Sequence, residues 1–145
     1  MIIRRMCEAD LDQVTALEQE IFSDPWTRGD FAAEISAQGH CYLVVEEEGE
    51  ILGYCGYWGV AGEAQIFNVA VRPASRGRGS GRQMMEALMN QGKEDGLTEF
   101  TLEVRISNEP AIRLYHGLGF QDVGIRKRFY QKPVEDALLM TAWME

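Results

Sequence analysis

The feature that most constrains the fold of this chain is a run of glycines and arginines, R-G-R-G-S-G, at residues 76–81. An apolar segment at 66–71 precedes the run, and an amphipathic segment begins near Arg82. This succession predicts a strand, a Gly-rich turn and the start of a helix. Glycine tolerates positive φ and lets a ligand approach the backbone, and the first amides of a helix bind anions. The sequence therefore predicts a site for a phosphate-bearing ligand.

The spacing of these glycines excludes two common phosphate-binding motifs. A Walker loop ends in Gly-Lys followed by Ser or Thr, and no lysine follows these glycines. The dinucleotide fingerprint G-x-G-x-x-G would need a glycine at the position of Arg82. The remaining pattern is R-x-x-G-x-G, formed by Arg76, Gly79 and Gly81. Taken alone, it is also compatible with a basic surface turn, so the flanking segments have to decide.

The rest of the chain predicts strands and helices that alternate over a single domain, residues 1–145. Apolar residues recur at helical spacing in four segments, near 8–21, 27–37, from about 82 onward, and from 107 or 108 to 117. Thr27 and Asp30 have the spacing of a capping box. Strand-like runs cover 2–6, 41–47, 51–58, 65–71, 98–104, 121–129 and 137–143. The order β-α-α-β-β-β-α-β-α-β-β predicts an α/β layered fold with a mixed sheet.

Composition and charge narrow the class of protein further. The formal net charge of −9 argues against a nucleic-acid-binding surface and is compatible with a basic peptide substrate. No apolar run is long enough to predict a membrane span, and the N-terminus has no signal-peptide pattern. The three cysteines show no C-x-x-C spacing, and His40 and His116 lie in no metal-ligand pattern. We expect a cytoplasmic protein without a metal, with its cysteines buried and reduced.

Further segments resemble the GNAT family of N-acetyltransferases, whose acyl-CoA pyrophosphate loop has the pattern [QR]-x-x-G-x-[GA]. They are F-N-V-A-V-R-P at 67–73, L-E-V-R-I-S-N at 102–108, A-I-R-L-Y-H-G-L-G-F at 111–120 and Y-Q-K-P-V-E-D-A-L-L-M at 130–140. The resemblance implies the acyl-CoA N-acyltransferase fold, an α/β fold with a mixed, mostly antiparallel sheet flanked by helices. It also implies acetyl-CoA as the co-substrate. Together with Pro25-Trp26, the segments at 102–108 and 130–140 are similar to members that acetylate the N-terminal alanine of a small-subunit ribosomal protein.

The resemblance assigns roles to individual residues. Glu103 would be the general base that deprotonates the amine, directly or through one water, unless it is a surface or salt-bridged glutamate beside Arg105. Tyr115 would be the general acid for the CoA thiolate, although its place on the apolar helical face also predicts core packing. A backbone N–H of Val69 or Ala70 would hold the oxyanion. The expected contacts to acetyl-CoA are Val69, Ala70, Val71, Arg76, Gly77, Arg78, Gly79, Ser80, Gly81, Arg82, Asn108 and Tyr115. Of these, Asn108 is also a candidate helix cap.

The sequence leaves alternatives to this function open. The leading expectation is direct transfer of the acetyl group to a protein N-terminus, with both substrates bound at once. The same fold could instead act on another protein N-terminus or on a small amine. A non-catalytic acyl-CoA-binding module is a third possibility, and the joint presence of Glu103 and Tyr115 argues against it. The oligomeric state is left open.

Overall fold

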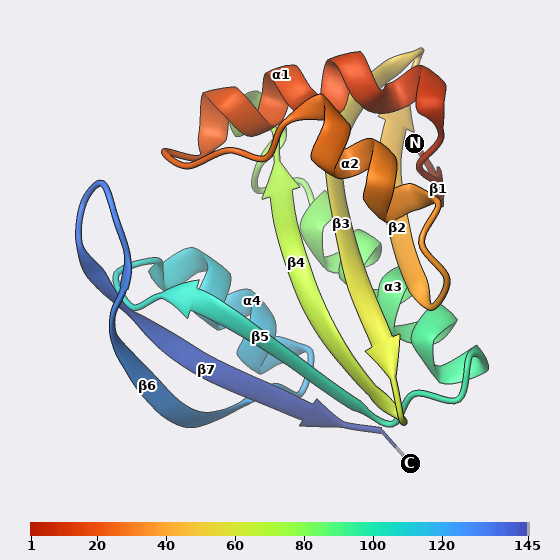
Figure 1. Ribbon diagram of the computed structural model, residues 1–145. Coiled ribbons are helices and arrows are strands. Elements are labelled where there is room, and N and C mark those ends of the chain that lie inside the picture. The colour runs from red at the N-terminus through yellow and green to blue at the C-terminus, as the bar shows by residue number, and fades with distance from the viewer. Residues whose placement is uncertain (145) are drawn as a thin grey trace.

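Seven strands form one sheet in the order β1-β2-β3-β4-β5-β7-β6, and Figure 1 shows its course. The computed structural model describes residues 1–144. The strands are β1 (Ile2–Arg5), β2 (His40–Glu47), β3 (Glu50–Val60), β4 (Glu63–Val71), β5 (Glu99–Arg105), β6 (Gln121–Tyr130) and β7 (Glu135–Trp143). Only β4 and β5 pair in parallel, and the other neighbours are antiparallel. The predicted α/β fold with a mixed, mostly antiparallel sheet is confirmed.

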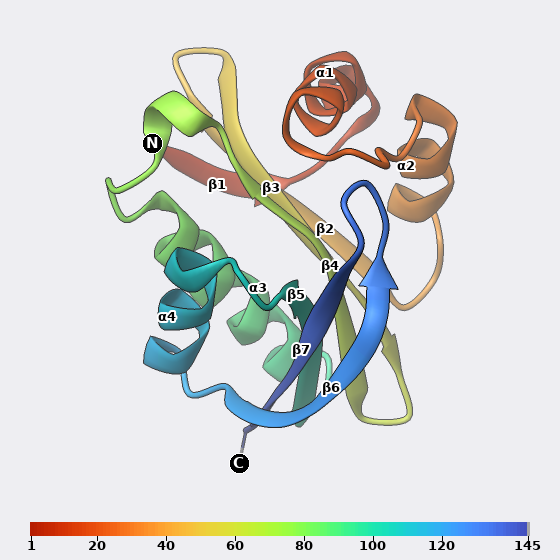
Figure 2. The ribbon, with the colours of Figure 1, turned by 90° about the vertical axis from the view of Figure 1, so that its left-hand side faces the viewer.

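Four helices cover the two faces of the sheet. They are α1 (Leu11–Ile21), α2 (Arg28–Ile35), α3 (Ser80–Glu94) and α4 (Glu109–Gly117), with short 3₁₀ turns η1 (Glu8–Asp10) and η2 (Pro73–Ser75). Figure 2 shows α1 and α2 on one face and α3 and α4 on the other. None of the helices within residues 1–144 combines the length and the apolar character that a membrane crossing needs.

Each face of the sheet has its own apolar core. On the α3 face, the fully buried Met84, Met85 and Leu88 pack in one cluster with strand residues such as Phe100 and Leu102. The methionines of α3 are therefore core residues, as their helical spacing predicts. On the α1 face, a second cluster includes Leu11, Val14, Phe31, Val44 and Tyr54. Because both faces are covered, the central strands β2 and β3 are buried over most of their length.

β4 and β5 separate soon after they begin. Their pairing runs from Glu63 and Glu99 to Gln65 and Thr101 and stops there. Figure 1 shows the two strands meeting at their N-terminal ends and diverging toward their C-terminal ends. As a result, the edge of β4 that faces β5 is not paired with β5 beyond Gln65, and the sheet is open between the two strands. This opening lies between the two layers of helices.

β4 is also bulged where it has left β5. Ala70 pairs with Tyr54, and Phe67 pairs with Gly56, so Asn68 and the residue after it face a single residue of β3. Asn68 has a φ of 55°, a left-handed conformation that Asn tolerates better than most residues. The bulge reorients the backbone at the position where the sequence places the oxyanion donors.

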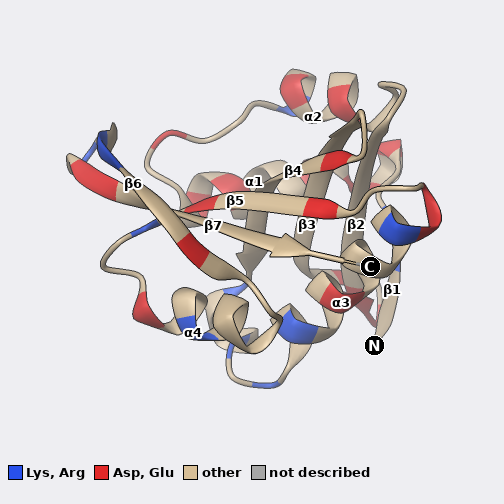
Figure 3. Cartoon of the chain, turned by 90° about the horizontal axis from the view of Figure 1, so that it is seen from below, with Lys and Arg blue, Asp and Glu red and all other residues tan. Residues whose placement is uncertain are grey.

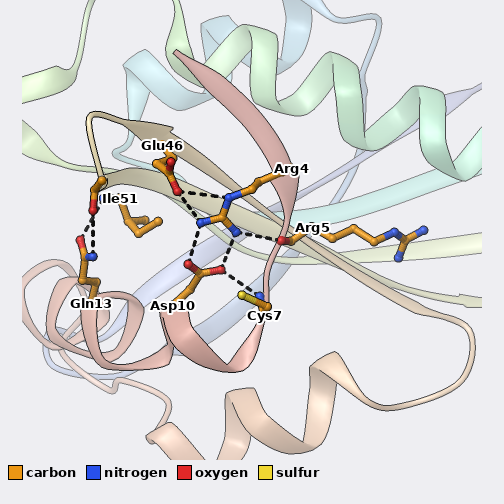
Figure 4. A network of polar contacts seen from close by, with 8 residues as sticks. Arg4, Arg5, Cys7, Asp10, Gln13, Glu46 and Ile51 are labelled. Atoms are coloured by element: carbon orange, nitrogen blue, oxygen red, sulfur yellow. Dashed lines mark hydrogen bonds and ion pairs between the residues drawn. The ribbon is translucent and has the colours of Figure 1, made fainter.

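Polar contacts connect β1 with the start of α1 and with β2 (Figure 4). The guanidinium of Arg4 donates two 2.8 Å hydrogen bonds to Asp10 and pairs with Glu46 of β2. These bonds from Arg4 lower the pKa of the buried Asp10 carboxyl, which also accepts the Cys7 amide at 2.8 Å. Glu46 therefore belongs to an ion-pair network, because the strand register brings it opposite β1.

Local signals mark most element boundaries correctly. Thr27 and Asp30 form the predicted capping box at the start of α2. The helix after the Gly-rich turn begins at Ser80 and not near Arg82, because Gly79 is its N-cap with a φ of 82°. The expectation of three buried cysteines is wrong for Cys7, which is exposed where the chain leaves β1, whereas Cys41 and Cys55 are buried.

Candidate active site

A cleft of about 770 Å³ occupies the opening between β4 and β5. Residues of two further segments also line it: 21–26, which runs from the end of α1 toward α2, and 129–133, which runs from the end of β6 toward β7. Ser23 and Gln131 bring these two segments within 3.5 Å, hydroxyl to carbonyl oxygen. Five of the predicted site residues from distant parts of the chain line this cleft: Val69, Arg76, Glu103, Asn108 and Tyr115. The structure therefore brings the two predicted catalytic residues together.

Glu103 and Tyr115 approach the cleft from opposite faces of the sheet. Side chains alternate along β5, so Glu103 points away from the face that Leu102 and Val104 occupy. Leu102 and Val104 belong to the same apolar cluster as Tyr115, on the α3 and α4 side. Glu103 therefore faces the α1 and α2 side. A reacting group held in the opening would have a carboxylate on one side and a phenol on the other.

Glu103 is largely shielded but still accessible to the cleft. Its side chain is 18% exposed, and its nearest ionic partner is Arg126 of β6 at 3.9 Å. Burial and the negative charge of Glu103 raise the pKa of the neighbouring Tyr130 to about 12. Arg105, the sequence neighbour considered as an ion-pair partner, instead pairs with Glu135 at 3.1 Å. The Glu103 carboxylate therefore remains accessible for a proton transfer in the cleft.

Tyr115 combines a packed ring with a position on the cleft wall. It is 5% exposed, and its ring meets Phe120 edge-on at a centroid distance of 5.8 Å. Burial raises the pKa of the Tyr115 phenol well above its usual value, so the hydroxyl keeps its proton at neutral pH. The sequence suggested core packing and catalysis as two roles of this residue. The packing role is confirmed, and the lining position leaves the catalytic one available.

The Gly-rich segment has the backbone geometry of an anion site. Gly77 and Gly79 have φ of 80° and 82°, which glycine adopts without strain. The first hydrogen bond inside α3 runs from the Gln83 N–H to the Gly79 oxygen at 3.1 Å, so the amides of residues 80–82 precede it. Free first-turn amides and the positive end of the helix dipole suit a pyrophosphate. The segment therefore fits the phosphates of acetyl-CoA.

The arginines of this segment surround the start of α3, beside α4 (Figure 3). Arg76 donates to the Val71 carbonyl at 3.0 Å, and Arg78 lies 3.4 Å from Glu47. Arg82 donates to the Gly117 carbonyl of α4 at 3.3 Å. The remaining predicted contacts lie outside the cleft lining: Ala70, Val71, Gly77, Arg78, Gly79, Ser80, Gly81 and Arg82. Among them, Ala70 and Ser80 are buried, and Gly81 lies between the side chains of Val71 and Leu114. These residues could reach a ligand mainly through their main chain.

Replacing Gly79 by Ala should weaken acetyl-CoA binding about tenfold. The left-handed conformation costs an L-residue about 1–2 kcal/mol, so the loop would relax in the free protein, and binding would have to restore it. Calorimetry measures the affinity, and circular dichroism checks the fold. Gly96→Ala is the matched control, because Gly96 has a φ of 84° and open space around it in the turn after α3. Equal affinities for the two variants would exclude the 76–82 segment from the ligand site.

Arg105 and Glu135 anchor the segment between β6 and β7. The sequence suggested Arg105 only as an ion-pair partner of Glu103 and gave Glu135 no role. Arg105 donates to the carbonyls of Gln131 and Pro133 at 3.0 Å each, and its guanidinium lies 4.5 Å from the centre of the Tyr130 ring. The second Glu135 oxygen accepts the Ser107 amide at 2.7 Å. Hydrogen bonding from Ser107, through its hydroxyl first and its amide second, lowers the Glu135 pKa. Hydrogen bonds and an ion pair therefore connect the motif at 102–108 with the motif at 130–140. The family resemblance had marked both motifs as important, but it did not indicate that Arg105 and Glu135 contact each other.

Comparisons with known proteins agree with this geometry. Residues 11–120 match the family model described as Acetyltransferase (GNAT) family. An Escherichia coli (strain K12) [ribosomal protein bS18]-alanine N-acetyltransferase is 36% identical over 90% of this chain and 89% of that protein. A Bacillus subtilis (strain 168) protein, provisionally given the same name, is 40% identical over 95% of this chain and 92% of its own.

Solved structures extend the agreement to the fold. The crystal structure of a ribosomal-protein-alanine N-acetyltransferase from Escherichia coli superposes with a TM-score of 0.90 at 30% identity, covering 99% of this chain and 94% of that one. A Salmonella typhimurium acetyltransferase structure described with its cofactor acetyl-CoA has a TM-score of 0.88 at 22% identity, over 100% and 94% of the two chains, and shows the likeness of fold. With the family model and the near full-length relatives, these findings establish that the chain belongs to the acetyltransferase (GNAT) family.

Proposed function

We propose that this enzyme transfers the acetyl group of acetyl-CoA to the N-terminal α-amine, an alanine, of a small-subunit ribosomal protein. The observation that carries the proposal is the cleft in the split sheet, which Glu103 and Tyr115 both line together with Arg76 of the Gly-rich segment. Relatives that are 36% and 40% identical over nearly the whole chain carry names that specify ribosomal protein bS18 and its alanine. Such a substrate also implies a cytoplasmic enzyme.

Acetyl-CoA would enter from the side of α3 and α4. The amides of residues 80–82 and the arginines around them would hold the pyrophosphate. Asn108 caps α4 by accepting the Ala111 amide at 3.3 Å, which leaves its own amide group free to contact the ligand. A main-chain N–H of Val69 or Ala70, at the bulge of β4, would polarise the thioester carbonyl. Main-chain donors at a bulge are suited to this task because they are fixed before the substrate binds.

The peptide would enter from the side of α1 and α2, between the segments 21–26 and 129–133. Its N-terminal amine has a pKa near 8 and is mostly protonated at neutral pH. Glu103 would accept the proton, directly or through one water, and the freed amine would attack the carbonyl carbon. The C–S bond then breaks, and Tyr115 would donate its proton to the departing thiolate. The products are an N-acetylated peptide and free CoA.

The proposal is tested by intact-mass measurement of defined peptides after incubation with the enzyme and acetyl-CoA. A peptide that matches the bS18 N-terminus and begins with a free alanine should gain one acetyl group. The same peptide with a blocked N-terminus and an internal lysine should react far more slowly, because the proposed acceptor site between 21–26 and 129–133 takes the end of a chain and not a side chain. Spermidine serves as the small-amine probe. Faster modification of the lysine or of spermidine would contradict the assignment to protein N-termini.

A further inference from the structure

Glu18 is a buried carboxylate on the wall of the cleft for which the proposed chemistry has no use. It lies in the last turn of α1 and is 2% exposed. One of its oxygens accepts the Tyr54 hydroxyl at 2.7 Å. The other accepts the Trp26 amide at 3.0 Å and the Asn68 side-chain amide at 3.3 Å. The three donors come from β3, from the segment before α2 and from the bulge of β4, so Glu18 joins three parts of the fold.

An ordinary packing role does not account for a carboxylate at this position. The negative end of the helix dipole disfavours an acidic residue in the last turn of α1, and burial disfavours any charge that is not well hydrogen-bonded. The neighbouring positions of the helix, Val14 and Leu17, are apolar and pack in the core. An apolar residue at position 18 would meet the same packing need. It could not hold the three donors.

Asn68 depends on Glu18 for its side-chain partner. Its Nδ2 points to the Glu18 carboxylate, and its Oδ1 is buried with no hydrogen-bond partner within residues 1–144. The opposite amide orientation would place Oδ1 against the carboxylate, and two acceptors repel each other. The carboxylate therefore fixes the orientation of this side chain, which belongs to the left-handed residue of the bulge. The next residue, Val69, lines the cleft.

We infer that Glu18 is a positioning residue for acetyl transfer, which acts through Asn68 and Trp26. It holds the β4 bulge so that a main-chain N–H is aimed into the opening, and by the same carboxylate it holds Trp26 on the acceptor side. This inference rests on the proposed function, because it takes a main-chain N–H of the bulge as the hydrogen-bond donor to the thioester carbonyl. In this role Glu18 acts through these two residues and not on the reacting atoms.

Glu18→Gln tests the inference with little change in volume. It removes the negative charge that strengthens all three hydrogen bonds, and its NH₂ group can no longer accept from a donor. We expect kcat to fall about tenfold or more, as for a misplaced oxyanion donor, with KM for acetyl-CoA little changed. Asp10→Asn is the matched control. It alters another buried carboxylate of the α1 region, which lies outside the cleft lining, and should lower the melting temperature while kcat is kept.

A double-mutant cycle tests whether Glu18 acts through Asn68. Asn68→Gly allows the positive φ but removes the contact to the carboxylate. The double variant Glu18→Gln with Asn68→Gly should have about the kcat of the slower single variant, because both changes break one connection. Multiplied losses would overturn the inference. So would a Glu18→Gln loss that disappears at high pH, which would make Glu18 a base and not a positioning residue.

Amide hydrogen exchange tests the positioning role of Glu18 without any substrate. In the ligand-free protein, Glu18→Gln should speed exchange of the amides at 68–70, whereas Asp10→Asn should leave them as in the wild type. Unchanged exchange at 68–70 in Glu18→Gln, or an equal increase in both variants, would overturn the inference. If the wild-type enzyme fails to acetylate the alanine peptide, the proposed function fails. The exchange comparison would still show whether Glu18 controls the bulge.

Discussion

Glu103→Gln should lower kcat for acetylation of the alanine peptide about 100-fold or more, because it removes the general base and keeps the side-chain shape. The loss should shrink at a pH well above 8, where most of the substrate amine is already deprotonated. Affinity for acetyl-CoA should be kept, since Glu103 points to the α1 and α2 side of the sheet. Steady-state rates over a pH series, with calorimetry for acetyl-CoA, measure both effects.

Glu99→Gln is the matched control for this experiment. Glu99 lies on the same strand and the same face as Glu103, and its carboxylate accepts the Trp143 indole N–H at 2.7 Å, outside the cleft lining. Its kcat should equal that of the wild type. A Glu103→Gln enzyme with full kcat, or with a loss that is the same at every pH, would contradict the role of Glu103 as base.

Tyr115→Phe is expected to lower kcat by at least about tenfold, because it removes the proton donor to the CoA thiolate. The ring contact with Phe120 remains, so thermal stability and acetyl-CoA affinity should be nearly unchanged. The raised pKa of Tyr115 means that the phenol is protonated throughout the neutral range. The fractional loss should therefore be the same at pH values on both sides of neutrality, unlike the loss for Glu103→Gln.

Tyr57→Phe separates catalysis from the stability of this core. Tyr57 is buried in the same apolar cluster, and its hydroxyl donates to Asp95 at 2.6 Å, away from the cleft. Its removal should lower stability by about 1.5 kcal/mol and leave kcat as it is. If Tyr115→Phe behaves in the same way, losing stability with kcat intact, its hydroxyl is a structural group. Another donor, such as a water, would then have to supply the proton.

Signals between residues a few positions apart were enough for the sequence to determine the strands and helices of this protein and the glycine turn before α3. The capping box of Thr27 and Asp30, the turn at Gly79 and the helical spacing of the α3 methionines each depend on the local backbone alone. For this reason the order of strands and helices could be predicted from the sequence. The family and the grouping of Glu103 with Tyr115 came instead from the resemblance of longer segments to the GNAT family.

Only the tertiary structure decided which distant groups meet. Glu18 and Asn68 are 50 positions apart, and Arg105 and Glu135 are 30 apart. Their contacts depend on strand register, on the bulge of β4 and on the early end of its pairing with β5. The same register moved Glu46 into an ion pair and placed Glu103 and Tyr115 on opposite faces of the opening. A sequence pattern records which residues are present, but these contacts arise from the packing of whole elements, which no local spacing encodes.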